Sequence, residues 1–315
     1  MFDVNMKEIQ SGDNELESVL QDNGKNNSRK PGIKLEDGKW ILQKSYTDNE
    51  NSFKTLDPNP LHYRGDFERE NISEKTGFEK PIAPGMWMIS LAEQAIEELY
   101  KLPLTNITVK RFVNPVEIDT YLKCVINVDD EQKKVIEKPK ENRASLDSIE
   151  KKIKCLTFNR DKDREVRAFN VEYDFRPRYQ REKIKGYSFK REINGEDYGN
   201  YLESIGIKNG LFRKNLPRTY FASALISKAL ISVSEIEESG LGFYRSMNIN
   251  FFDAIDDIEG GNIYQTKINE KDEILPKNDK DLPQYVFNIQ GYNPKEDMIM
   301  DGIINVSLFK DMKKE

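Results

Sequence analysis

The chain has 315 residues, of which 33% are charged and 37% hydrophobic, and its formal net charge is −6. This length suits two domains or two halves of one domain, and the acidic balance without a basic patch argues against nucleic acid as a partner. The sequence has neither a run of about 18 apolar residues nor a secretory signal, so we expect a cytoplasmic protein without a membrane span.

Bound cofactors and metals have no support in the sequence. There is no GxxxxGK[ST] motif and no GxGxxG motif after a strand, so nucleotide cofactors are not expected. One histidine and two cysteines without HExxH-type spacing predict no zinc site. Cys124 and Cys155 lie in separate strand-like runs, and we expect both to be reduced thiols in the core.

Composition divides the chain into three parts. Residues 1–38 are polar throughout and predict an N-terminal arm. The rest divides into a first half, residues 39–176, and a second half, residues 177–315, in which the same order of elements recurs. The residues alone therefore predict an α+β architecture in which one long helix wrapped by an antiparallel sheet occurs twice.

The elements of the first half follow from periodicity and from breaking residues. In chain order we expect a strand from Trp40, a short helix over 48–56, a charged overhang over 63–80 with one short helix around 66–75, a helix from Pro84 to Pro103, strands within 106–128, a charged loop over 129–150, and a hairpin of 153–159 and 165–174.

The helix that starts at Pro84 has one apolar face. Ile89, Ala92, Ile96 and Leu99 recur at spacings of three and four, which is typical of a helix that packs one face on a core. The polar residues between them predict a solvent-facing side, which is made of Glu93, Gln94, Glu97 and Glu98.

The second half repeats this order. We expect a short helix from Tyr198 to Ile207, a long helix from Pro217 to about Val233, strands at 246–256 and 262–269, and a hairpin of 284–291 and 298–309 around Asn293-Pro294.

Residues 57–90 contain the candidate chemistry. His62 is the only histidine of the chain and follows Asp57 by five residues, with two prolines between them that stiffen the turn. An aspartate and a histidine held in this way can exchange protons with a substrate. Pro84-Gly85 then opens a helix, whose start presents unpaired N–H groups and the positive end of its dipole. These parts suit acid–base chemistry on a carbonyl compound.

Three stretches carry a resemblance to a known family. Asp57-Pro-Asn-Pro-Leu-His62, Gly77-Phe78 and Pro81-Ile-Ala-Pro-Gly-Met86 resemble the signature of the MaoC-like (R)-specific enoyl-CoA hydratases and 3-hydroxyacyl thioester dehydratases. Arg111-Phe-Val-Asn-Pro-Val116 resembles a strand of the same family, whereas the second half is similar only in outline. The resemblance implies the hot-dog fold, here a double hot dog with two long central helices each wrapped by an antiparallel β-sheet.

The resemblance also implies roles for individual residues. In that family an aspartate and a histidine hold a water and add it across a 2-enoyl thioester, or catalyse the reverse dehydration. Carried over, Asp57 and His62 would be the catalytic dyad, the N–H of Gly85 would bind the thioester carbonyl, and Asn59 would orient the turn. Met86 and Trp87 would line the substrate pocket, with plain core packing as the alternative for both.

The implied substrate is an acyl chain carried on CoA or on an acyl carrier protein, with no other cofactor, as in fatty-acid metabolism. A homodimer of double hot dogs is a further expectation. The sequence departs from the family where a histidine is replaced by Pro84, an aspartate by Arg64, and Gly-Asp by Asp119-Thr120. These differences bear on the shape and head group of the substrate. Tyr63 and Arg64 either meet a CoA phosphate or lie in a solvated loop.

The second half is expected to be non-catalytic, because it has no histidine and Arg218 stands where the first half has Gly85. It would then form the far wall of one acyl pocket. Two other functions remain open. One is a hot-dog thioesterase, whose acid on the central helix would be Glu93 or Glu97, and the other is a non-catalytic subunit that binds acyl thioesters.

Overall fold

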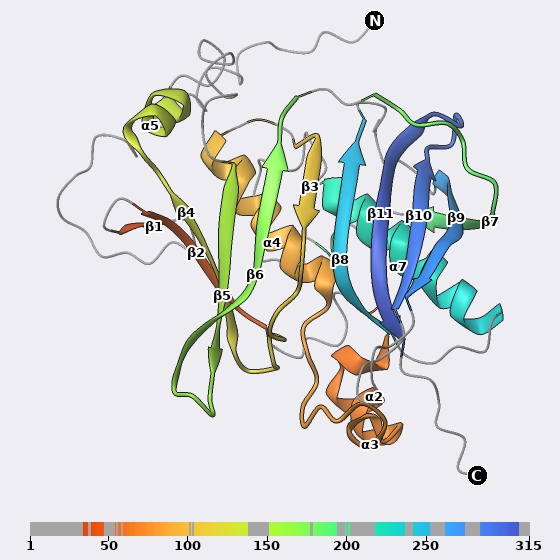
Figure 1. Ribbon diagram of the computed structural model, residues 1–315, viewed down its shortest axis with the longest axis horizontal. Coiled ribbons are helices and arrows are strands. Elements are labelled where there is room, and N and C mark those ends of the chain that lie inside the picture. Colours follow the sequence, from red (N-terminus) through yellow and green to blue (C-terminus); the bar gives the residue numbers. More distant parts are fainter. Residues whose placement is uncertain are drawn as a thin grey trace, which may run out of the picture. The chain divides into compact units, whose positions relative to one another are not determined.

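In the computed structural model, all residues with a described structure lie within Ile33–Glu315. Its main features are an antiparallel sheet and two long helices (Figure 1). No described helix is long and apolar enough to cross a membrane. The described residues are 34–36, 39–46, 54, 56–57, 59–100, 102, 104–137, 151–176, 179–193, 199, 201, 218–236, 242–252, 262–274 and 284–308.

The described strands form a single sheet in the order β1-β2-β4-β5-β6-β3-β8-β11-β10-β9-β7, and every neighbouring pair is antiparallel. Strand β1 (Lys34–Glu36) precedes the first half, which supplies β2 (Lys39–Ser45), β3 (Asn106–Val109), β4 (Tyr121–Asn127), β5 (Lys152–Asn159) and β6 (Arg164–Asp174). The second half supplies β7 (Tyr187–Ile193), β8 (Gly242–Phe251), β9 (Asn262–Ile274), β10 (Gln284–Tyr292) and β11 (Met298–Leu308).

The two sets of strands meet at a seam between β3 and β8, where Ile107 pairs with Ile249 and Val109 with Met247. The sequence predicted two sheets, and the structure differs because this backbone pairing makes them continuous. Strands β1 and β7 were not predicted, and β1 lies inside the segment 1–38 that we expected to be an arm. The hairpins β5–β6 and β10–β11 are confirmed.

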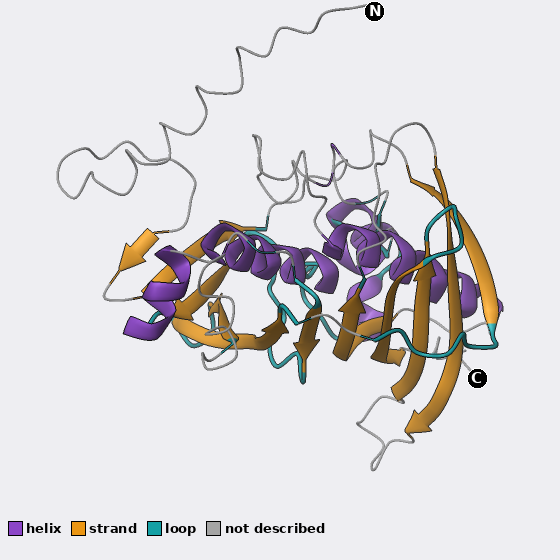
Figure 2. Ribbon diagram, turned by 90° about the horizontal axis from the view of Figure 1, so that it is seen from above, coloured by secondary structure: helices purple, strands orange, loops and turns teal. Residues whose placement is uncertain are grey.

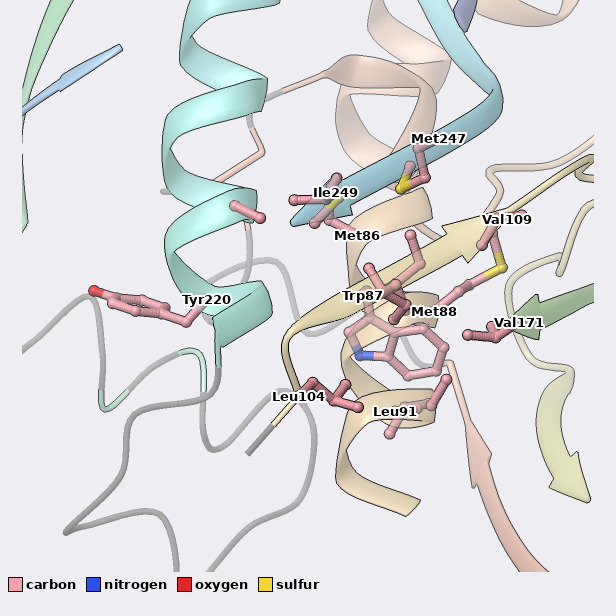
Figure 3. Packing of buried hydrophobic residues seen from close by; sticks show 14 of the residues in the cluster. Met86, Trp87, Met88, Leu91, Leu104, Val109, Val171, Tyr220, Met247 and Ile249 are labelled. Carbon is pink, nitrogen blue, oxygen red and sulfur yellow. The ribbon is translucent and has the colours of Figure 1, made fainter. Parts of the chain in front are cut away.

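Two long helices, α4 (Gly85–Tyr100) and α7 (Arg218–Ile236), lie on the same side of the sheet (Figure 2). The core fills the space between them and the strands. Figure 3 shows side chains from the first turns of α4, among them Met86 and Met88, lying with Val109, Met247 and Ile249 of the seam. The start of α4 is therefore fixed against strands of both halves.

The overhang after the first strand holds two short helices, where we expected one. They are α2 (Arg64–Arg69) and α3 (Ile72–Thr76), and they lie beyond the ends of the strands in Figure 1. The two helices are separated at Asn71, whose positive φ of 50° interrupts the helical conformation. Helix α3 ends at Gly77, whose φ of 73° is the left-handed conformation that glycine adopts without strain.

The prediction of a charged loop over 129–150 is wrong for its first part, which forms α5 (Asp130–Glu137). The side chain of Asp129 accepts a hydrogen bond from the N–H of Gln132 at 2.7 Å, and the side chain of Gln132 accepts one from the N–H of Asp129 at 2.9 Å. This reciprocal cap starts the helix, and the fully buried Val135 anchors it to the core. Residues 138–150 lie outside the described residues.

The prediction of two reduced thiols in the core is confirmed. Cys124 and Cys155 are free and buried, and they face each other across β4 and β5 with their sulfurs 3.7 Å apart. The helices expected over 48–56 and from Tyr198 to Ile207 lie mostly outside the described residues.

Candidate active site

The turn of residues 57–62 is held rigid by its own polar groups. The side-chain oxygen of Asn59 accepts a hydrogen bond from the N–H of Leu61 at 3.1 Å and so caps the short 3-10 helix Pro60–His62. The N–H of Asn59 donates to Oδ1 of Asp57 at 3.4 Å. Two buried tyrosines hold the backbone from outside: Tyr63 donates to the carbonyl of Asp57 at 2.6 Å, and Tyr46 to that of His62 at 2.8 Å.

This turn places the side chains of Asp57 and His62 side by side. Oδ2 of Asp57 lies 3.7 Å from Nε2 of His62, and each residue is only 4% exposed. The other ring nitrogen, Nδ1, lies 2.8 Å from the carbonyl oxygen of Ile82. Because a carbonyl oxygen can only accept, Nδ1 carries the proton and donates it, and Nε2 presents its lone pair toward Asp57.

Burial lowers the pKa of His62 below its ordinary value of 6.5, and this effect outweighs the opposing charge of Asp57 and the hydrogen bond to Ile82. The imidazole is therefore neutral at pH 7. Two acceptors, the carboxylate of Asp57 and Nε2 of His62, then face each other at a distance slightly longer than a hydrogen bond. Such a pair can be bridged by a water that donates one hydrogen to each of them.

The start of α4 is brought to this turn by backbone pairing. The N–H of Ile82 donates to the carbonyl of Leu61 at 3.2 Å, and the N–H of Ala83 donates to that of Val116 at 2.7 Å. Pro84 and Gly85 follow directly. Among the described residues, no group accepts a hydrogen bond from the N–H of Gly85, so it keeps the donor capacity of a helix N-terminus.

The other residues assigned to the site by sequence have mainly packing positions. Met86 is fully buried and Trp87 is 2% exposed, and both belong to the main core. The indole of Trp87 meets the ring of Tyr46 edge-on, with 5.1 Å between centroids. Asn59 links the halves as well as capping the turn, because its Nδ2 donates to the carbonyl of Gly242 on β8 at 2.9 Å.

Arg64 on the overhang pairs with Asp119, and both stand where the sequence departs from the signature that it resembles. Arg64 donates to Asp119 at 3.0 Å, and Asp119 has a positive φ of 61°, the conformation in which the family's glycine is unstrained. A groove of about 660 Å³ lies beside this pair and is lined by residues that include Phe67 and Lys80. Tyr63 is 1% exposed, so the solvated-loop alternative is wrong for it.

The expectation that Glu93 faces solvent is also wrong. Glu93 is fully buried at the start of α7, where its carboxylate accepts hydrogen bonds from the N–H of Arg218 at 2.7 Å and the N–H of Thr219 at 2.9 Å, and also from the Thr219 hydroxyl. The periodicity of α4 did not reveal this, because the partner that covers this face is another helix of the same chain.

The sequence predicted the second half as a wall of the pocket but did not identify Tyr244 as the residue that meets the start of α4. The ring of Tyr244 on β8 lies against Gly85: a Cβ added to Gly85 would come within 2.5 Å of Cδ2 of that ring. A Gly followed by aromatic residues at 242–244 was the available signal, but the strand was expected to begin only at residue 246.

The comparisons with known proteins agree with this fold. A conserved hypothetical protein of Mycobacterium tuberculosis with a double hot-dog fold is 10% identical, has a TM-score of 0.54, and aligns over 90% of this chain and 97% of its own. A putative MaoC domain protein dehydratase from Chloroflexus aurantiacus is 8% identical, with a TM-score of 0.54 over 89% of this chain and 95% of its own. No curated protein matches the sequence.

The sheet with its two long helices is thus a double hot dog. Residues 35–152 match the MaoC like domain, a region that contains the Asp57–His62 turn and all of α4. The first half of this chain is therefore similar to MaoC-like domains.

Proposed function

We propose that the protein adds water to trans-2-enoyl thioesters to give (3R)-3-hydroxyacyl thioesters, or catalyses the reverse dehydration. The observation that carries this proposal is the approach of Oδ2 of Asp57 to Nε2 of His62, at 3.7 Å, between two buried side chains. A carboxylate and a neutral imidazole at this distance can hold one water and take a proton from it.

The reaction needs three groups. A base accepts a proton from the water as its oxygen forms a bond to Cβ, an acid returns a proton to Cα as the double bond is lost, and a donor stabilises the carbonyl oxygen of the thioester. We assign the first two tasks to the Asp57–His62 dyad together and the third to the N–H of Gly85. One such donor is worth on the order of 3 kcal/mol in the transition state.

The remaining assignments follow from this scheme. Asn59 supports the turn without touching the substrate. The second half contributes a wall of the pocket. It has no histidine for a dyad, and the donors at the start of its helix α7 bind Glu93 and not a substrate carbonyl. The acyl chain would be carried on CoA or an acyl carrier protein, and no other cofactor enters the reaction. Two such chains could pair as a homodimer without changing the chemistry.

The alternative of a thioesterase with an acid on the central helix has less support. Glu93, the better placed candidate, already accepts hydrogen bonds from two backbone N–H groups and a hydroxyl, so its carboxylate is committed to the start of α7. A non-catalytic thioester-binding subunit would have no need for a buried carboxylate and imidazole 3.7 Å apart.

A direct test mixes the protein with crotonyl-CoA. Loss of the enoyl absorbance without free thiol is expected, with (3R)-3-hydroxybutyryl-CoA as the product. Asp57→Asn and His62→Gln should each lower kcat/KM about a thousandfold, since each removes proton transfer that is worth 10²–10⁴-fold. A chain-length series of enoyl-CoAs would then define the acyl pocket.

The matched control is Asp130→Asn, which changes an exposed aspartate paired with Lys133 and should leave turnover intact. Release of thiol by the wild-type protein would indicate the thioesterase instead. Binding of crotonyl-CoA with neither signal would indicate the non-catalytic subunit.

A further inference from the structure

The first residues of β8 bring the second half into contact with the candidate active site. The carbonyl of Gly242 accepts a hydrogen bond from Asn59, and the ring of Phe243 meets Phe78 edge-on with 6.2 Å between centroids. Tyr244 follows, and its ring lies against Gly85. Three successive residues of the second half therefore contact the segment that carries the dyad and the start of α4.

The contact between Tyr244 and Gly85 leaves no room for a side chain at position 85. A Cβ built on Gly85 would lie 2.5 Å from Cδ2, 3.3 Å from Cε2 and 3.5 Å from Cγ of the tyrosine. Real Cβ atoms do not approach a ring so closely, so glycine is required here by the ring and not by backbone torsion. The ring thus covers the residue whose N–H is the proposed carbonyl donor.

The hydroxyl end of the same side chain lies near the dyad. Burial raises the pKa of Tyr244, and the negative charge of Asp57 raises it further, while the neighbouring hydroxyl of Ser227 on α7 acts in the opposite direction. The phenol is therefore protonated at physiological pH and serves as a hydrogen-bond donor close to a carboxylate.

We propose that Tyr244 is a positioning residue of the site, supplied by the otherwise non-catalytic second half. Its ring fixes the start of α4 and the direction from which a thioester carbonyl reaches Gly85. Its hydroxyl lies within the electrostatic range of the Asp57 carboxylate, so it contributes a polar group beside the dyad. This role rests on the proposed hydration, and it gives the second half a defined part in the chemistry.

Kinetics of conservative variants test this role. Tyr244→Phe keeps the ring and removes the hydroxyl, so kcat for crotonyl-CoA should fall about tenfold while KM stays within about twofold. Tyr244→Leu removes the ring as well and should lower kcat/KM about a hundredfold. The control is Tyr264→Phe, another buried strand tyrosine of the second half, whose ring packs on Phe221 away from Gly85 and whose loss of a hydroxyl should not change turnover.

A second measurement needs no turnover. In protein labelled with 3-fluorotyrosine, the fluorine resonance that is absent from Tyr244→Phe should shift in Asp57→Asn, because that substitution removes the nearby charge. An unchanged resonance, or full activity of Tyr244→Phe, would overturn the role of Tyr244 alone. If the wild-type protein hydrates no enoyl thioester, the proposed function fails first and this role falls with it.

Discussion

The starts of α4 and α7 are the two most instructive regions to compare. Both are N-termini of long central helices, and both present backbone N–H groups at the positive end of a helix dipole. At α7 these donors bind the carboxylate of Glu93 from the first half. At α4 the first donor, on Gly85, has no acceptor among the described residues and lies beneath the ring of Tyr244.

The comparison shows how one structural feature is used in two ways. When a carboxylate of the same protein caps a helix N-terminus, the cap links two parts of the structure. The N–H donors there already have an acceptor and are not free to bind a ligand. A helix start that keeps its donor beside a carboxylate and an imidazole is suited to binding a carbonyl oxygen. Under the proposed function the halves would differ because Glu93 caps α7, whereas no carboxylate among the described residues caps α4.

The largest effect is expected from Glu93→Ala. The substitution leaves two buried N–H groups without an acceptor and opens a cavity, so the free energy of unfolding should fall by about 4 kcal/mol. Urea denaturation measures it. Glu98→Ala, on the same helix but partly exposed, is the control and should cost less than about 1 kcal/mol. A loss as small as that of the control would show that the capping of α7 by Glu93 contributes little to the free energy of unfolding.

A smaller effect is expected on kcat/KM when the first residue of each long helix is replaced. Gly85→Ala places a Cβ 2.5 Å from the ring of Tyr244, so the ring or the first turn of α4 must move, and kcat/KM for crotonyl-CoA should fall about a hundredfold. Arg218→Ala, at the matching position of α7, loses a hydrogen bond to the carbonyl of Phe252 but keeps the backbone donor to Glu93. Its activity should stay within about twofold. Equal losses in both variants would mean that the two starts are equivalent.

Much of the fold could be predicted from local patterns. The apolar periodicity after Pro84, the alternation in β5–β6 and β10–β11, and the turn at Asn293-Pro294 all act within about 20 residues, so the sequence alone reveals them. Helix α5 was missed because its signal is a short reciprocal cap with a single buried valine. The continuous sheet was missed because the β3–β8 seam joins residues about 140 positions apart, and no local pattern records that pairing.

The features of the site also separate into those set by local sequence and those set by contacts between the halves. The approach of Asp57 to His62 depends on a stiff turn of six residues, and the sequence motif specified it. The cap of α7 by Glu93 and the contact of Tyr244 with Gly85 depend on how the halves pack together. Glu93 was expected in solvent because its neighbours along α4 are polar, whereas a helix from the other half covers it.

The smallest expected effect is on the free energy of unfolding. It comes from the ionisation of Glu97, a second carboxyl group close to Glu93. Glu97 lies one turn after Glu93 on α4, and its pKa is raised well above 4.5, first by burial and then by the charge of Glu93. A carboxyl whose pKa is higher in the folded protein binds more protons there than in the unfolded chain. The free energy of unfolding therefore falls as pH rises from 4.5 through the folded pKa, and the penalty is complete above it.

Glu97→Gln keeps the shape of the side chain and removes this charge. The variant should be more stable than the wild type by roughly 1 kcal/mol at about pH 8, and the gain should vanish near pH 4, where the wild-type carboxyl is protonated in both states. Denaturant unfolding at the two pH values measures the difference, with Glu98→Gln as the control. A gain that does not depend on pH would place its origin in packing. In that case the charge of Glu93 would not destabilise the ionised form of Glu97. The N–H groups of Arg218 and Thr219, which donate to Glu93, would compensate this charge fully.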